Sequence, residues 1–258
     1  MELSVEMVAI VWPFVNENIM STNWNFKEAA IMIFGCMLNG PSIDTLRSII
    51  QEGCGILLNI LMTDPNVSVR DSAAWVLCEI CGRYLNEVPA SMQTTLIESL
   101  IAALDMEPRV ASHCAFALSF IFDSVAGDPT NTFLQPYFLT LLQKILAVCE
   151  RTGSANAQVR ENASFALMSL ISCHIPETDP MLIEFYNFVL QKCEATFVCL
   201  FTHSFILSLI LSLTHSLIHL LFEDNQIDRP NQPRYHLQLP DLLLCDVDLT
   251  GRAIKGYL

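Results

Sequence analysis

Carboxylate and aromatic side chains lie close together in one short stretch of the sequence, residues 66–83 (NVSVRDSAAWVLCEICGR). Apolar residues recur there at steps of three and four, which predicts a helix with one apolar face. The stretch also carries Asp71, Trp75 and Glu79. A surface of carboxylates around an indole is the chemistry that a basic polypeptide segment binds.

Other chemistry is less well supported. Cys78 and Cys81 form a C-x-x-C in the helix interior without a second pair, so we expect core cysteines and no metal site. We find no recognisable Ser-His-Asp or Cys-His motif and no glycine-rich phosphate loop, so we expect neither enzyme activity nor a cofactor. The ten cysteines lie mostly in apolar helical stretches, which is typical of reduced proteins of the cytoplasm or nucleus.

The opening stretch has three relatives elsewhere in the chain. Residues 26–32 (FKEAAIM), 110–116 (VASHCAF) and 159–165 (VRENASF) resemble residues 69–75 (VRDSAAW). In this alignment one bulky position recurs at steps of 43, 41 and 49 residues, and it holds Met32, Trp75, Phe116 and Phe165. Repeats of about 40–47 residues with paired helices are typical of HEAT and armadillo arrays.

The intervening segments predict the partner helices. Apolar helical patterns occupy residues 7–19, 46–62, 90–104 and 133–149, and a fifth pair is expected to begin at 181–193. Pro13 predicts a kink in the first of these helices, and the 133–149 helix is expected to start at Phe133. The sequence therefore predicts an all-α HEAT-repeat solenoid of about four helix pairs within residues 1–195.

The charge of the chain indicates the kind of partner. Of its 258 residues, 52% are hydrophobic and only 16% are charged, and the formal net charge is −14. Residues 1–195 carry 21 acidic and 9 basic residues. This acidic balance disfavours nucleic acid and favours basic partners. The first residues include Glu2 and Glu6 and no basic residue, unlike a signal peptide.

Three consecutive repeats carry a set of further motifs: NWNFKEAA at 23–30, FGC at 34–36, NGP at 39–41, DP at 64–65, VRDSAAW at 69–75 and EPRVAS at 107–112. With these motifs the chain resembles the central HEAT repeats of the importin-beta (karyopherin-beta) family. The resemblance covers about residues 11–195. The resemblance implies a nuclear import receptor whose inner helices bind the basic segment of the adaptor importin alpha, or basic cargo.

The resemblance also implies roles for single residues. Trp75 matches an inner-surface tryptophan that packs on arginine side chains in the family, and Phe116 occupies another such position, where the cation–π contact would be weaker. The predicted partner-binding residues are Trp75, Phe116, Asp71, Glu79, Glu28 and Glu161. Two alternatives stay open: Asp71 could instead join a ladder between repeats, and the three glutamates could form a solvated face.

Further partners follow from the resemblance. Ran and nucleoporins are partners of the family, although the repeats that carry most of those contacts precede the matched part. We expect a protein of the cytoplasm and nucleus. The alternatives are a generic HEAT scaffold for protein assembly and a membrane-anchored helical protein.

Residues 196–258 differ in composition from the rest of the chain. Residues 196–222 contain no Asp, Glu, Lys or Arg, and 27 residues are enough to cross a bilayer of about 30 Å. Three histidines make this a poor membrane span. The segment is a divergent apolar helix, a membrane helix or sequence unrelated to the family. Residues 223–258 form a polar tail with three prolines, which predicts a loose segment.

Overall fold

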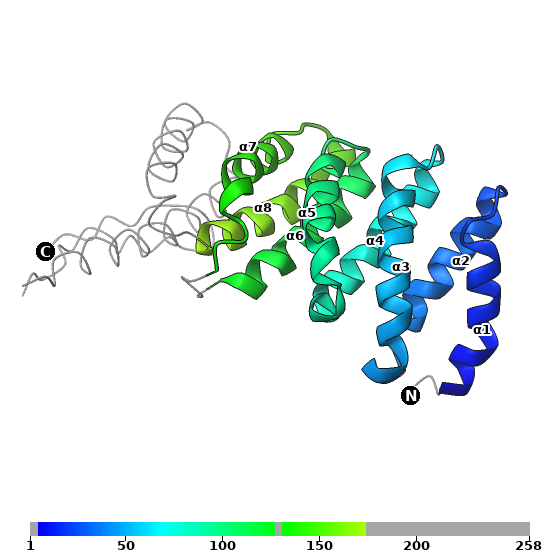
Figure 1. Ribbon diagram of the computed structural model, residues 1–258. Helices are drawn as coiled ribbons and strands as arrows, with labels where there is room; N and C mark the ends of the chain where they lie inside the picture. Colours follow the sequence, from blue (N-terminus) through cyan, green and yellow to red (C-terminus); the bar gives the residue numbers. More distant parts are fainter. Residues whose placement is uncertain (1–4, 127–130, 174–258) are drawn as a thin grey trace, which may run out of the picture. The chain divides into compact units, whose positions relative to one another are not determined.

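The computed structural model describes residues 5–126 and 131–173. Within these residues the chain forms eight α-helices and no strand (Figure 1). The helices are α1 (Val5–Asn18), α2 (Trp24–Met37), α3 (Ile43–Thr63), α4 (Val67–Arg83), α5 (Ala90–Ala103), α6 (Pro108–Val125), α7 (Phe138–Cys149) and α8 (Ala157–Ser172). They make four successive pairs, which confirms the predicted all-α class and the number of pairs.

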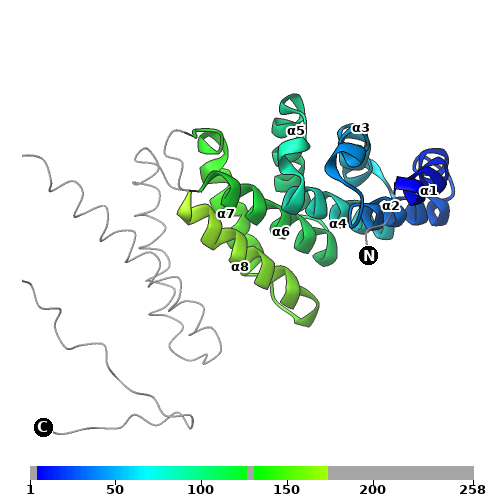
Figure 2. The same cartoon turned by 90° about the horizontal axis from the view of Figure 1, so that it is seen from below.

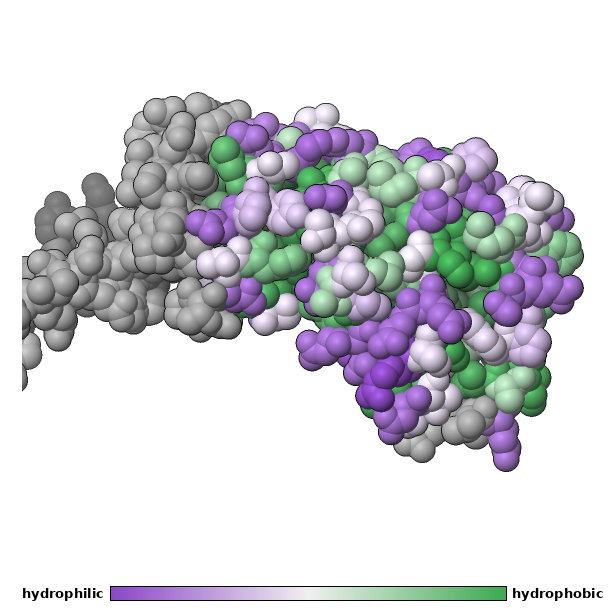
Figure 3. Space-filling view, in the orientation of Figure 1, coloured by the Kyte–Doolittle hydropathy of each residue, from purple (hydrophilic) through white to green (hydrophobic). Residues whose placement is uncertain are grey.

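The pairs stack as in a HEAT solenoid. The two helices of each pair pack together, and the second helices α2, α4, α6 and α8 each pack on the next. Figure 2 shows α3 and α5 on one side of the row formed by α4 and α6. Polar and apolar residues are interspersed on the face seen in Figure 3. The predicted repeat architecture is therefore confirmed.

Local sequence sets where several helices begin. The Asn66 side chain accepts a hydrogen bond from the Ser68 backbone N–H at 2.9 Å and caps α4. Pro108 stands in the first turn of α6, where its missing N–H costs nothing. The helix predicted to start at Phe133 starts at Phe138 instead. A 3-10 turn that contains Pro136 precedes it, because this proline lacks the N–H that a helix interior needs.

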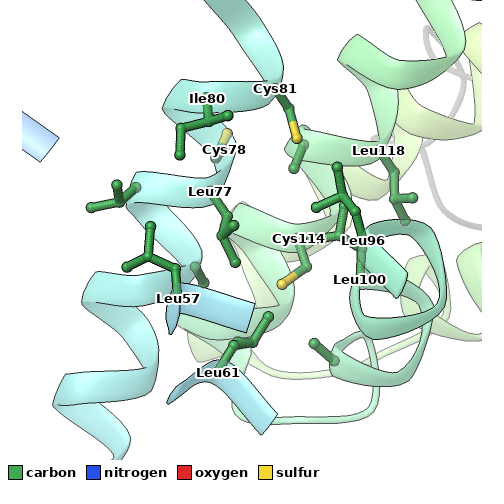
Figure 4. Packing of buried hydrophobic residues seen from close by; sticks show 14 of the residues in the cluster. Leu57, Leu61, Leu77, Cys78, Ile80, Cys81, Leu96, Leu100, Cys114 and Leu118 are labelled. Carbon is green, nitrogen blue, oxygen red and sulfur yellow. The ribbon is translucent and has the colours of Figure 1, made fainter. Parts of the chain in front are cut away.

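The core is continuous from one repeat to the next. Figure 4 shows Leu57 of α3, Leu77 of α4, Leu100 of α5 and Leu118 of α6 converging in one region. All four side chains are fully buried. Each helix pair can bury only part of its apolar surface by itself, so the repeats stabilise one another.

Ion pairs at equivalent positions join neighbouring repeats. Lys27 Nζ lies 2.6 Å from Asp64 Oδ2, and Arg70 Nη2 lies 2.6 Å from Glu107 Oε1. Lys27 and Arg70 are aligned in the sequence repeat, and each acceptor directly precedes a proline. Arg70 also donates to the Asp64 carbonyl oxygen at 2.6 Å. These contacts fix the start of each second helix against the second helix of the repeat before it.

Several predictions fall outside the described residues. They are the fifth pair from 181, the apolar segment 196–222 and the tail 223–258. Among the described helices, none is both long and apolar enough to cross a membrane.

Candidate binding groove

A groove of about 590 Å³ runs across the second helices of three consecutive repeats. Its walls come from α4, α6 and α8, and we call it the second-helix groove. The solenoid creates it, because these helices follow one another in sequence only at intervals of about 40 residues. Two of the residues predicted from sequence as partner contacts on different repeats, Trp75 and Phe116, come together in it.

Trp75 forms part of the α4 wall and part of the core at the same time. Its side chain is half-buried and packs against the apolar interior. A Cβ atom built on Gly35 would lie 2.3 Å from the indole Cζ3 and 2.6 Å from Cη2. The end of the ring therefore rests on the backbone of α2, at the one residue type that leaves room for it.

Glu79 lies one turn after Trp75 and also lines the groove. Its carboxylate forms an ion pair with Arg83, four residues further along α4. Arg83 donates a second hydrogen bond to Asn39 Oδ1, in the loop after α2. The Glu79 side chain keeps 24% of its surface exposed, so a ligand can reach this carboxylate, although an arginine of the chain already holds it.

The α6 and α8 walls are aromatic. Phe116 is 37% exposed and Phe165 is 50% exposed. The Phe120 ring lies 4.7 Å from the Phe116 ring, centroid to centroid. A Cβ atom on Gly82 would lie 3.0 Å from the Phe120 ring, so the ring lies directly over this glycine of α4. Exposed aromatic side chains grouped in one groove are typical of binding surfaces.

Asp71 lies behind the groove and is not part of its lining. The residue is only 7% exposed. Its Oδ2 lies 2.6 Å from Arg109 Nη2, and its Oδ1 lies 3.5 Å from His113 Nε2. Burial lowers the pKa of His113 below its usual value, with a further lowering by Arg109, while Asp71 and Glu79 act in the opposite direction. His113 itself lines the groove.

Between the next two repeats, the equivalent of the contact between Asp71 and His113 is made by neutral groups. Asn162 Nδ2 donates to Ser112 Oγ at 2.9 Å and to the Ser112 carbonyl oxygen at 3.1 Å. In the sequence alignment Ser112 is equivalent to Asp71, and Asn162 is equivalent to His113. The geometry favours the ladder between repeats as the role of Asp71, the alternative to direct partner contact.

Comparisons with known proteins agree with this architecture. Residues 95–202 match the family model "Importin subunit beta-1-like, TPR repeats", and residues 54–84 match the HEAT repeat. The chain is 30% identical to importin subunit beta-1 of Arabidopsis thaliana over 198 residues, which are 74% of this chain and 23% of the relative. Importin subunit beta-1 of Schizosaccharomyces pombe is 26% identical over 190 residues, 72% of this chain and 22% of that protein.

A solved structure extends the match to three dimensions. A crystal structure of importin beta superposes with a TM-score of 0.67 at 26% identity, covering 78% of this chain and 24% of that one. The chain belongs to the importin beta family. It spans less than a quarter of the length of the curated relatives it matches. Structures of Kap95, one of them a Kap95:Nup1 complex, share the fold at 20–21% identity.

The other two predicted contacts of this importin-beta-family chain lie outside the groove lining. Glu28 is half-buried on α2. Glu161 is exposed on α8 and accepts a hydrogen bond from Gln158 Nε2 at 3.3 Å. Both stay predictions as partner contacts. A solvated face, the alternative, fits Glu161 better than Glu28.

Sequence reasoning missed part of the groove. It did not select Phe165, His113 or Phe120 as contacts. The signal for Phe165 was present, because it aligns with Trp75 and Phe116 at the bulky position of the repeat. No comparable signal existed for Phe120, which reaches the groove only because Gly82 lies opposite.

The two cysteines of the C-x-x-C motif belong to the core. Cys78 and Cys81 are buried, and neighbouring buried cysteines lie on α3 and α6. Burial raises the pKa of the Cys78 thiol to about 12, so it stays protonated at neutral pH. Across the residues that the structure describes, no three His, Cys, Asp or Glu side chains are grouped to hold a metal ion.

Proposed function

We propose that the chain takes part in nuclear import by binding a basic polypeptide segment in the second-helix groove. The partner is the basic segment of the adaptor importin alpha or a basic segment of cargo. Membership of the importin beta family supports the transport role. The groove on the second helices, with an indole and a reachable carboxylate, is the observation that carries the proposal.

The distribution of charge supports a cationic partner. The described residues include fifteen acidic and eight basic side chains. Six of the basic side chains form ion pairs with carboxylates, and the other two, Arg151 and Arg160, donate to backbone carbonyl oxygens. The positive charge is therefore used within the chain, and the surplus is carboxylate. Such a surface attracts cations at a distance and repels nucleic acid.

Trp75 supplies the contact that charge alone does not. An arginine side chain can lie on the exposed part of the indole while its guanidinium reaches Glu79, one turn away. The contact with the ring is less sensitive to salt than the contact with the carboxylate. We infer a binding role and no catalytic one. The relatives are named as importin subunits.

Other partners are proposed on the basis of the relatives. Solved relatives include Kap95 with Nup1 and Kap95p with RanGDP, and we propose a nucleoporin and Ran as further partners. A protein with this role moves between cytoplasm and nucleus, so we expect it in both compartments.

The test is a titration of a fluorescent arginine-rich peptide with the full 258-residue chain at several salt concentrations. We expect affinity to fall steadily with added salt without vanishing. Trp75→Ala should weaken binding by about 2 kcal/mol or more, roughly thirtyfold. Because Trp75 also packs on Gly35, stability is measured in parallel and binding is expressed per folded molecule.

Two outcomes of the salt titration would contradict the proposal. One is the absence of binding at low salt. The other is an affinity that does not change with salt, which would leave a generic HEAT scaffold as the better description. If Trp75→Ala lowers only stability, the tryptophan is a core residue and the groove is not the binding site.

A further inference from the structure

We propose that the groove selects a segment carrying both a basic and a bulky apolar side chain, the basic one at Glu79 and the apolar one at Phe116 and Phe165. This inference rests on the proposed function and adds a requirement to it. A purely basic segment would use one end of the groove only. The proposal is based on the different chemistry of the two ends of the groove.

The α4 end of the groove holds its charge. Glu79 and Arg83 form their ion pair there, and the indole of Trp75 lies one turn away. A ligand arginine can compete with Arg83 for the carboxylate, because both bring the same guanidinium. This end therefore fits a cation.

The groove lining that α8 contributes carries no charged side chain. It consists of Gln158, Asn162 and Phe165. Asn162 is already engaged with Ser112, and Gln158 with Asn162 and its neighbour Glu161. Besides the exposed Gln158, the α8 end offers a ligand the apolar side chain of Phe165, a residue that is 50% exposed.

Phe120 extends this apolar wall toward α4. Its ring packs at 4.7 Å from Phe116 and lies over Gly82, where a Cβ atom would come within 3.0–3.3 Å of three ring carbons. Any side chain at residue 82 would have to displace the ring. Because residue 82 is a glycine, an aromatic surface continues from α8 across α6 to the edge of α4. This surface would bury an apolar ligand side chain such as leucine.

The solenoid spacing sets the distance between the two ligand residues. Neighbouring packed helices lie about 8–10 Å apart, so the aromatic wall between α6 and α8 lies roughly 12–15 Å from α4. An extended chain advances about 3.3 Å per residue. The basic and apolar residues of the ligand should therefore be about four or five positions apart.

The experiment compares two peptides of equal length and charge on the full chain. One has a leucine four residues from its arginine pair, and the other has serine in its place. Anisotropy at low salt should show the leucine peptide binding about tenfold more tightly. Phe165→Ser should remove that difference, because it weakens binding of the leucine peptide more than binding of the serine peptide.

Met32→Ser is the matched control. Met32 occupies the aligned position on α2, is 43% exposed and lies outside the groove lining, so this variant should keep the preference for leucine. Equal affinity of both peptides for the wild-type chain overturns the inference, and so does a preference that survives Phe165→Ser. If neither peptide binds, the proposed function fails as well. Salt-dependent binding without a leucine preference removes only the inference.

Discussion

The close contact between the Trp75 ring and Gly35 provides a test of how the α4 wall of the groove is held in place. In Gly35→Ala the new methyl group would lie 2.3 Å and 2.6 Å from two indole carbons and 2.9 Å from Val76 Cγ2. Contacts this short require the ring or the helix to move. Overpacking of this kind costs about 1–3 kcal/mol. Replacing a helical glycine by alanine gains about 1 kcal/mol in helix propensity. With a severe clash, we expect a net loss of about 2 kcal/mol.

Gly55→Ala is the matched control within the same solenoid. Gly55 also lies inside a helix, α3, but its nearest neighbour is the flexible Cε of Met92 at 3.1 Å. That end of a methionine can shift at little cost, so helix propensity should dominate and stability should rise by up to about 1 kcal/mol. The two variants differ in what the methyl group meets and share the same chemical change.

The assay is thermal and urea unfolding of the full chain, followed by circular dichroism. A loss of about 2 kcal/mol corresponds to roughly 4–8 °C in Tm for a chain of this size. Indole fluorescence should shift in Gly35→Ala, because the ring moves toward solvent. Equal stability of Gly35→Ala and Gly55→Ala would refute the reasoning, since the indole would then not be held against α2.

Three more variants test the remaining contacts. Arg83→Gln should tighten binding of an arginine-rich peptide about threefold to tenfold by freeing Glu79, and an unchanged affinity would mean that this carboxylate faces no ligand. His113→Gln should flatten the loss of stability on acidification. Burial lowers the pKa of His113, so the unfolded chain takes up its proton first as pH falls below about 6.5. Urea midpoints at pH 7.5 and 5.5 would show this, and equal pH dependence of variant and wild type would contradict it. Asn162→Ala should lower the free energy of unfolding by about 1–2 kcal/mol, because Ser112 loses its partner across the repeats. Unchanged stability in urea unfolding would mean that this contact does not stabilise the stacking of the repeats.

Much of the fold could be predicted from the sequence because its signals are local. The 3.6-residue apolar pattern over residues 66–83 predicted α4, which the structure has at Val67–Arg83. The aligned bulky residues also indicated which face of the second helices carries the large side chains. Trp75, Phe116 and Phe165, three of the four aligned residues, line one groove. The start of α7 was the clearest error, where Pro136 made a 3-10 turn of residues that looked helical.

The candidate site depended on contacts that no local pattern encodes. Asp71 and Glu79 both looked like inner-surface carboxylates, yet Asp71 is buried against Arg109 while Glu79 reaches the groove. Nothing in the helix itself separates them. Their difference comes from the next repeat, which covers one residue and leaves the other open.

The sequence by itself determined the helices, their pairing and the position in each repeat that carries a large side chain. These features depend on residues within one or two turns of each other, or on a repeat that the alignment displays. Only the tertiary structure decided which of the polar and aromatic residues meet. Phe120 reaches the groove because Gly82, 38 positions earlier, has no side chain. Packing distances between stacked helices are set by the pairs of residues that face each other across the repeats, and a single chain pattern does not contain those pairs.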